Sequence, residues 1–72
     1  MAELTTAQYD ELERAVAGGQ RIAIRRRGTE YLLVPDRLRT DAGRELIEAR
    51  NPTTGDHMKL YVDEIDGFEV VG

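Results

Sequence analysis

The 72-residue chain contains no cysteine, no serine and no tryptophan, and it has a single histidine, His57. Without cysteine there is no disulfide, no thiol nucleophile and no thiolate metal site. No threonine has a histidine base near it in the sequence, and Asp56-His57 fits a turn better than an acid–base pair. The acids Asp63, Glu64 and Asp66 fit a solvated turn better than a cation site. We therefore expect a protein that is not an enzyme and that uses no metal and no cofactor.

Long hydrophobic runs are also missing from the sequence. No stretch approaches the about 18 apolar residues that a membrane span requires. Residues 1–6 lack the basic and apolar regions of a signal peptide. We therefore expect a single cytoplasmic domain over residues 1–72, with no membrane contact.

Lysine is nearly absent, because nine of the ten basic residues are arginine. Residues 21–50 hold eight arginines against five acids, whereas residues 1–20 and 51–72 are acidic and the whole chain has a net charge of -4. The negative total argues weakly against nucleic acid as a partner. Arginine, however, offers a planar fork that suits a carboxylate or a phosphate. The basic middle and the acidic ends therefore need separate interpretations.

The N-terminal residues predict an amphipathic helix over about residues 6–17. Thr5 and Gln8 fit a capping box, in which each side chain accepts a hydrogen bond from the other residue's backbone N–H. The helix ends at a double glycine, because glycine adopts the left-handed conformation at low cost. Apolar residues at steps of three and four form one stripe along this helix: Tyr9, Leu12 and Val16.

After the double glycine, the period of the apolar residues changes from 3.6 to 2, which predicts strands. Five strands are expected, over about residues 20–26, 30–40, 44–50, 56–62 and 68–71. Pro35 cannot donate to a strand ladder, so it marks an edge, a bulge or a bend. Residues 41–43 fit a three-residue turn, and residues 63–67 fit one tight helical turn. The sequence thus predicts a mainly β, α+β domain whose short, strongly bent antiparallel strands close into a small barrel.

A turn centred on Arg27-Gly28 would pair the first two strands. It places Arg25 opposite Glu30, where the two can form a cross-strand ion pair. The second strand is apolar on both faces, and the helix stripe is the expected cover for the face that carries Leu32. The expected core comprises these residues: Leu12, Val16, Ile22, Ile24, Leu33, Leu46, Leu60, Val62, Ile65, Phe68 and Val70.

Two sets of short motifs resemble known bacterial families. Residues 9–15 and 60–65 resemble the Rof family of Rho-binding antiterminators. Residues 31–35, with Leu38 and again residues 60–65, look like the core of WYL domains, which are Sm-like modules of bacterial regulators. Both resemblances imply an SH3-like or Sm-like barrel. The Rof resemblance also implies a protein partner, the RNA-binding termination factor Rho, which binds the acidic face of the helix. The positions that match this face are Asp10, Glu11 and Glu13.

Three functions follow as alternatives. The first is a non-catalytic regulator that binds a protein through the acidic helix. The second is a nucleic-acid-binding Sm-like module that contacts phosphates through Arg21, Arg25, Arg26 and Arg27. Of these four, Arg21, Arg25 and Arg27 are expected on one face of the first strand. The third is a structural part: either a subunit that assembles through strand edges or a phage head–tail joining protein. Both charged segments also have a simpler interpretation as solvated surface, and the oligomeric state is not predicted.

Overall fold

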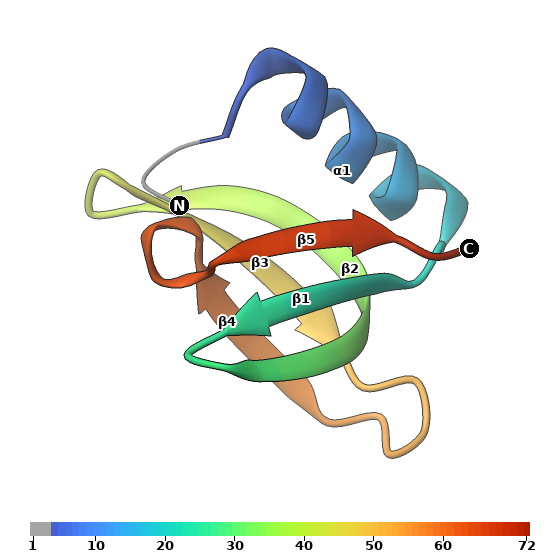
Figure 1. Ribbon diagram of the computed structural model, residues 1–72. Helices are drawn as coiled ribbons and strands as arrows, with labels where there is room; N and C mark the ends of the chain where they lie inside the picture. The colour runs from blue at the N-terminus through green and yellow to red at the C-terminus, as the bar shows by residue number, and fades with distance from the viewer. Residues whose placement is uncertain (1–3) are drawn as a thin grey trace.

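The computed structural model describes residues 4–72 as one helix followed by five antiparallel strands (Figure 1). The elements are α1 (Thr6–Gly18), β1 (Ile22–Arg26), β2 (Thr29–Asp41), β3 (Arg44–Arg50), β4 (His57–Tyr61), the 3-10 helix η1 (Val62–Glu64) and β5 (Gly67–Val70). The predicted element order and the mainly β class are confirmed. No helix in residues 4–72 has the length and the apolar character needed to cross a membrane.

The five strands form one sheet in the order β4-β3-β2-β1-β5. The first half of β2 pairs with β1 and the second half pairs with β3, so β2 belongs to both halves of the sheet. The register shifts between Pro35 and Arg37, which makes Asp36 the additional residue of a β-bulge. Pro35 therefore lies at a bulge, one of the three positions predicted for it. The edge strands β4 and β5 do not pair with each other, so the sheet is open where a closed barrel was predicted.

Both tight hairpins use a two-residue turn with positive φ at both central residues. Arg27 and Gly28 have φ values of 52° and 78°, and Ala42 and Gly43 have 52° and 79°. These signs match the type I′ turn, whose twist suits antiparallel strands. The predicted three-residue turn at residues 41–43 is wrong, because Asp41 is already paired with a strand residue on the other side of the turn. Each hairpin thus holds one non-glycine residue in the left-handed region.

The helix begins and ends where the local sequence signals indicate. The Gln8 backbone N–H donates to Thr5 Oγ1 at 3.2 Å, and the Thr5 backbone N–H donates to Gln8 Oε1 at 2.9 Å. The predicted capping box is confirmed. At the other end, Gly19 adopts a φ of 64° and its N–H is directed at the carbonyls of the last turn. These caps fix where α1 starts and stops relative to β1.

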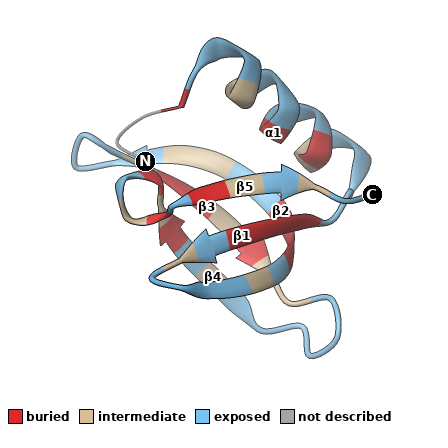
Figure 2. Ribbon diagram, in the orientation of Figure 1, coloured by how far each residue is buried: buried red, intermediate tan, exposed pale blue. Residues whose placement is uncertain are grey.

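The core lies between α1 and the face of the sheet that carries Ile22, Ile24 and Leu33 (Figure 2). Leu12 and Ala15 of α1 are buried there. The expected cover for Leu32 is absent: its neighbour Leu33 faces the core, whereas Leu32 is 46% exposed. The helix therefore covers the face opposite the one predicted, because successive strand residues point to opposite sides of a sheet.

Most of the expected core is buried, with differences at both ends of the chain. Val16, Phe68 and Val70 are half-buried, because α1 and the short edge strand β5 are covered on one side only. Ile47 and Ala49 of β3, which were not in the expected core, are buried with the other core residues. β3 therefore contributes more buried side chains to the core than β5 does.

Candidate functional site

The acidic side of α1 carries the three carboxylates that sequence analysis singled out. Asp10, Glu11 and Glu13 are all exposed. Asp10 and Glu13 are three residues apart and lie on the same side of the helix, whereas Glu11 is turned about 100° from Asp10. None of the three takes part in an ion pair within residues 4–72. The helix therefore presents a pair of carboxylates on one side and a third apart from them.

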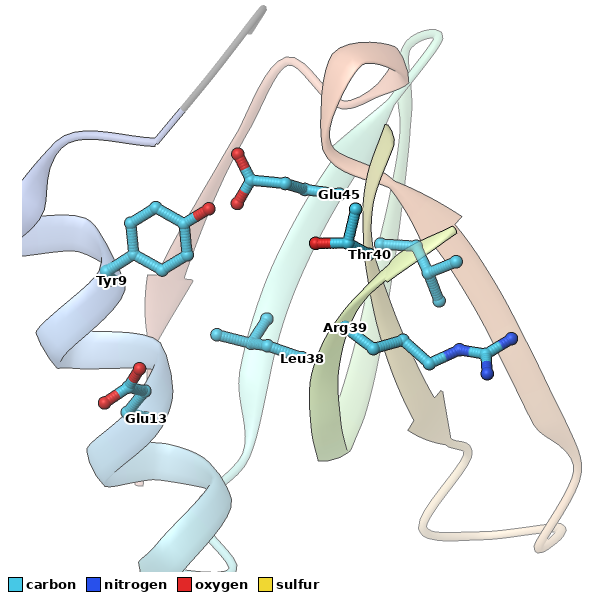
Figure 3. A pocket seen from close by; sticks show the side chains of 7 residues that line it. Tyr9, Glu13, Leu38, Arg39, Thr40 and Glu45 are labelled. Carbon is cyan, nitrogen blue, oxygen red and sulfur yellow. The ribbon is translucent and has the colours of Figure 1, made fainter. Parts of the chain in front are cut away.

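A groove of about 210 Å³ runs between this side of α1 and the β2–β3 hairpin (Figure 3). Its walls come from three elements: Tyr9 and Glu13 of α1, Leu38, Arg39 and Thr40 of β2, and Glu45 and Leu46 of β3. Tyr9 and Leu38 are half-buried against the core. The Tyr9 ring projects from α1 toward Glu45, and Leu38 projects toward the helix. The groove thus combines an apolar surface with carboxylates from two different elements.

The one arginine that lines the groove is directed away from it. Arg39 points to the opposite side of the sheet from α1 (Figure 3). Its Nε lies 2.7 Å from Glu48 Oε2, and Arg37 Nε lies 3.1 Å from the other oxygen of the same carboxylate. Arg39 Nε is buried and makes no hydrogen bond, so this contact rests on charge and not on hydrogen-bond geometry. The groove therefore keeps its negative charge.

A second, shallower hollow continues along α1 from the groove. It is lined by Asp10, Glu13, Arg14 and Ala17. Glu13 belongs to both hollows, so the acidic side of the helix and the groove form one continuous surface. We call this surface, made of Tyr9, Asp10, Glu13, Leu38 and Glu45, the acidic groove.

The acids near η1 are engaged inside the molecule. Arg44 donates from Nε to Asp63 Oδ2 at 2.9 Å and from Nη2 to Asp63 Oδ1 at 2.7 Å, and Nη2 also contacts Glu64 Oε2 at 3.2 Å. The guanidinium carbon lies 3.8 Å from the centre of the Tyr61 ring. The hydrogen bond from Arg44 lowers the pKa of Asp63, and the same pairing raises the pKa of Arg44. These acids therefore bind an arginine of the same chain.

The four arginines of the alternative site do not form one surface. Arg25 and Arg26 are consecutive in β1 and point to opposite faces of the sheet. Arg27 lies in the turn, and Arg21 precedes β1 at its other end, where its carbonyl accepts a hydrogen bond from Val71. The prediction that Arg21, Arg25 and Arg27 share one face of the first strand is therefore wrong, because two of them lie outside β1.

Two of these arginines have contacts that sequence analysis did not predict. Arg25 is in register with Glu30, as expected, but the two make no ion pair in the described part of the chain. The Arg25 guanidinium instead lies against Gly67, where an added Cβ would come within 2.7 Å of Nη2. Arg26 lies over the Tyr31 ring, 5.3 Å from its centre.

Tyr9, Leu38 and Glu45 were not predicted as members of a site. Tyr9 was assigned to the helix stripe, and Glu45 was counted only in the charge total. Alternation along the β2–β3 hairpin could have placed Leu38 and Glu45 on one face. This placement requires the register of the hairpin, which is set by the two-residue turn at Ala42-Gly43.

Metal chemistry has no candidate site in the described residues. No group of three or more His, Cys, Asp or Glu side chains within residues 4–72 is arranged to hold a metal ion. His57 Nδ1 lies 3.9 Å from Asp36 Oδ2, and both side chains are at the surface. The carboxylates of the acidic groove can attract a cationic group.

No protein-family model matches the chain, and no curated protein matches it. The resemblances to the Rof family and to WYL domains thus stay predictions that rest on short motifs.

Proposed function

We propose that this protein is a small, non-catalytic regulatory module that binds a basic segment of a partner protein through the acidic side of α1. The observation that carries the proposal is the placement of Asp10 and Glu13, which are exposed, unpaired within residues 4–72 and adjacent on the helix. Complementary charge accelerates association and disfavours acidic competitors. An Arg- or Lys-rich surface of a protein is the partner that this arrangement suits.

The distribution of ion pairs supports the choice of this surface over the other acidic segment. Asp63 and Glu64 share Arg44, which offsets one of their two charges, and Glu48 is shared between Arg37 and Arg39. Carboxylates that are already paired add little attraction for an external cation, because the charges cancel at short range. Asp10 and Glu13 therefore offer two carboxylates that have no ion pair in residues 4–72, and Arg14 is the one base that lines the same hollow.

The fold is consistent with the class of module that the resemblances imply. An N-terminal helix, a bent β2 shared by both halves of the sheet, and a 3-10 turn before the last strand support an SH3-like or Sm-like arrangement. We propose this class for the domain, with the edges between β4 and β5 left open. The Rof resemblance makes the cytoplasmic, RNA-binding factor Rho the first partner to test.

A charge-reversal pair tests the proposal. The double variant Asp10→Lys, Glu13→Lys should lose capture of a basic, RNA-binding partner in a pull-down, followed by isothermal titration with the purified partner. The matched control is Asp56→Lys, Asp66→Lys, which changes the net charge equally at exposed acids outside the acidic groove. Circular dichroism checks that both variants fold. Equal binding by the two double variants would contradict the proposal.

Nucleic-acid binding through the arginine hairpin is the second candidate. One observation favours it: Arg26 lies over Tyr31, and no carboxylate is paired with Arg25, Arg26 or Arg27 in residues 4–72. If these arginines bind phosphates, the affinity for a short single-stranded RNA should fall with salt, with a log–log slope of about −0.7 per phosphate contacted. Fluorescence anisotropy at low salt measures this directly, and the absence of binding there removes the candidate.

A further inference from the structure

We propose that the acidic groove seats one arginine side chain of the partner, with the guanidinium against Tyr9 and between Glu13 and Glu45. This inference rests on the proposed function and names the chemical group that the partner must supply. It is carried by a comparison within the molecule, between the way the protein holds its own Arg44 and the arrangement of the groove.

Arg44 occupies a seat made of one tyrosine and two carboxylates. Its guanidinium lies 3.8 Å from the Tyr61 ring centre, Asp63 accepts two hydrogen bonds from it, and Glu64 accepts a third. The arrangement uses each property that distinguishes arginine from lysine, because the planar group stacks on a ring while its edge binds carboxylates. Such charge-assisted, two-pronged contacts are among the stronger hydrogen bonds in proteins.

The part of the acidic groove between α1 and the β2–β3 hairpin offers the same three components. Arg14 lines only the second hollow, and the Arg39 side chain is directed away from the groove. Tyr9 supplies the ring, Glu13 supplies a carboxylate from α1, and Glu45 supplies a carboxylate from β3 (Figure 3). Arg39, which also lines this part of the groove, is directed to Glu48 on the other side of the sheet. The seat is therefore open to an arginine from outside.

The size and the apolar surface of the groove agree with a single side chain. The hollow between α1 and the β2–β3 hairpin has a volume of about 210 Å³, which is smaller than the roughly 300–1,000 Å³ of typical small-molecule pockets. Leu38 lies between the tyrosine and the sheet, where it can cover the methylene groups of an inserted arginine. An extended basic segment that crosses the groove would thus place one arginine inside it and further basic residues beside Asp10.

The experiment is an NMR titration of the full-length ¹⁵N-labelled protein with acetyl-Gly-Arg-Gly-amide. The matched probes are the lysine peptide and the citrulline peptide, which has the shape of arginine without its charge. We expect the arginine peptide to shift the amide signals of Tyr9, Leu38 and Glu45. The lysine peptide should bind more weakly, and the citrulline peptide should give no saturable shifts.

Two variants test the contribution of the carboxylates to the seat and leave Tyr9 unaltered. Glu45→Gln should lower the affinity for the arginine peptide by about two- to fivefold, as expected for a partly exposed ion pair. Glu69→Gln changes an exposed acid of β5 that lies outside the acidic groove, and it should leave the affinity unchanged. The spectra of the free variants show at once whether each retains the fold.

The outcomes separate this inference from the proposed function. Shifts confined to the outer side of α1, at Asp10 and Arg14, or equal affinity of Glu45→Gln and the unaltered protein, would overturn the seat and leave the proposed function standing. Equal binding of the citrulline peptide would also overturn the seat. Partner binding that is unaffected by Asp10→Lys, Glu13→Lys would remove the acidic helix as the partner site and would overturn the seat with it, because Glu13 belongs to both.

Discussion

Arg44 and Asp63 are joined by two hydrogen bonds, of 2.9 and 2.7 Å, although they lie 19 residues apart in the sequence. The pair links the start of β3 to η1, and the Tyr61 ring lies against the same guanidinium. The edge strands β4 and β5 do not pair with each other. The contact between Arg44 and Asp63 therefore attaches the segment between these two strands to β3.

The first prediction concerns the shape of the Arg44 side chain and not its charge. Arg44→Lys keeps the charge but removes the planar group that stacks on Tyr61 and binds Asp63 twice, so the melting temperature should fall. Arg50→Lys is the matched control, because Arg50 has a single contact of 3.3 Å with Asp36. Thermal unfolding followed by circular dichroism measures both, and an equal effect of the two changes would contradict the role given to Arg44.

The second prediction concerns acid pH. The pKa of Asp63 is lowered in the folded protein by its hydrogen bond from Arg44. The stability that this ionised pair contributes is therefore complete above the ordinary aspartate pKa of about 3.9, and it is lost as the pH falls through the lower folded-state pKa. An NMR titration of the Asp63 carboxyl should show a midpoint below that of a free aspartate. In Arg44→Gln the midpoint should return to the ordinary value; an unchanged midpoint would show that another group lowers it.

The third prediction concerns the turn at Ala42-Gly43. Ala42 has a φ of 52°, which costs an ordinary L-residue about 1–2 kcal/mol, whereas asparagine tolerates this region. Ala42→Asn creates the Asn-Gly pair that type I′ turns prefer and should raise the free energy of unfolding by about 1 kcal/mol. Ala42→Val should lower it, because a β-branched residue fits this region poorly. Urea denaturation distinguishes these results, and a stabilising valine would show that the turn differs from the one described.

The fourth prediction tests which face of the sheet lies under the helix. Leu12→Ala should lower the free energy of unfolding by about 2–5 kcal/mol, because Leu12 is fully buried between α1 and the sheet. Leu32→Ala should change it by no more than about 0.5 kcal/mol, because Leu32 is exposed on the other face. Chemical denaturation of the two variants checks this. A large loss in Leu32→Ala would place a cover over the outer face.

The local features of the fold could be predicted from the sequence because each is set by a few neighbouring residues. Thr5 and Gln8 define the helix start, and the double glycine defines its end. The alternation after the glycines indicates the strands, and the Arg27-Gly28 turn gives the correct pairing of Arg25 with Glu30. These signals require no knowledge of where distant segments meet.

The side of the sheet under α1 and the composition of the acidic groove could not be predicted in this way. Leu32 and Leu33 are equally apolar, so the sequence does not indicate which of them faces the helix. The groove joins Tyr9 to Glu45, which are brought together only after β2 passes the bulge at Asp36. One residue more or less in that bulge would turn Leu38 to the other face. Long-range packing decides both features.

One wall of the acidic groove comes from α1 and the other comes from β2 and β3, and no disulfide joins them because the chain has no cysteine. A partner that fills the groove contacts both walls at once, so its binding stabilises the folded state of this 72-residue domain. Its binding energy adds to the folding energy, and at a concentration one hundred times its Kd the gain is about 2.7 kcal/mol. Occupied and empty forms would then differ in their lifetime against proteolysis, which links partner supply to the amount of the protein that persists.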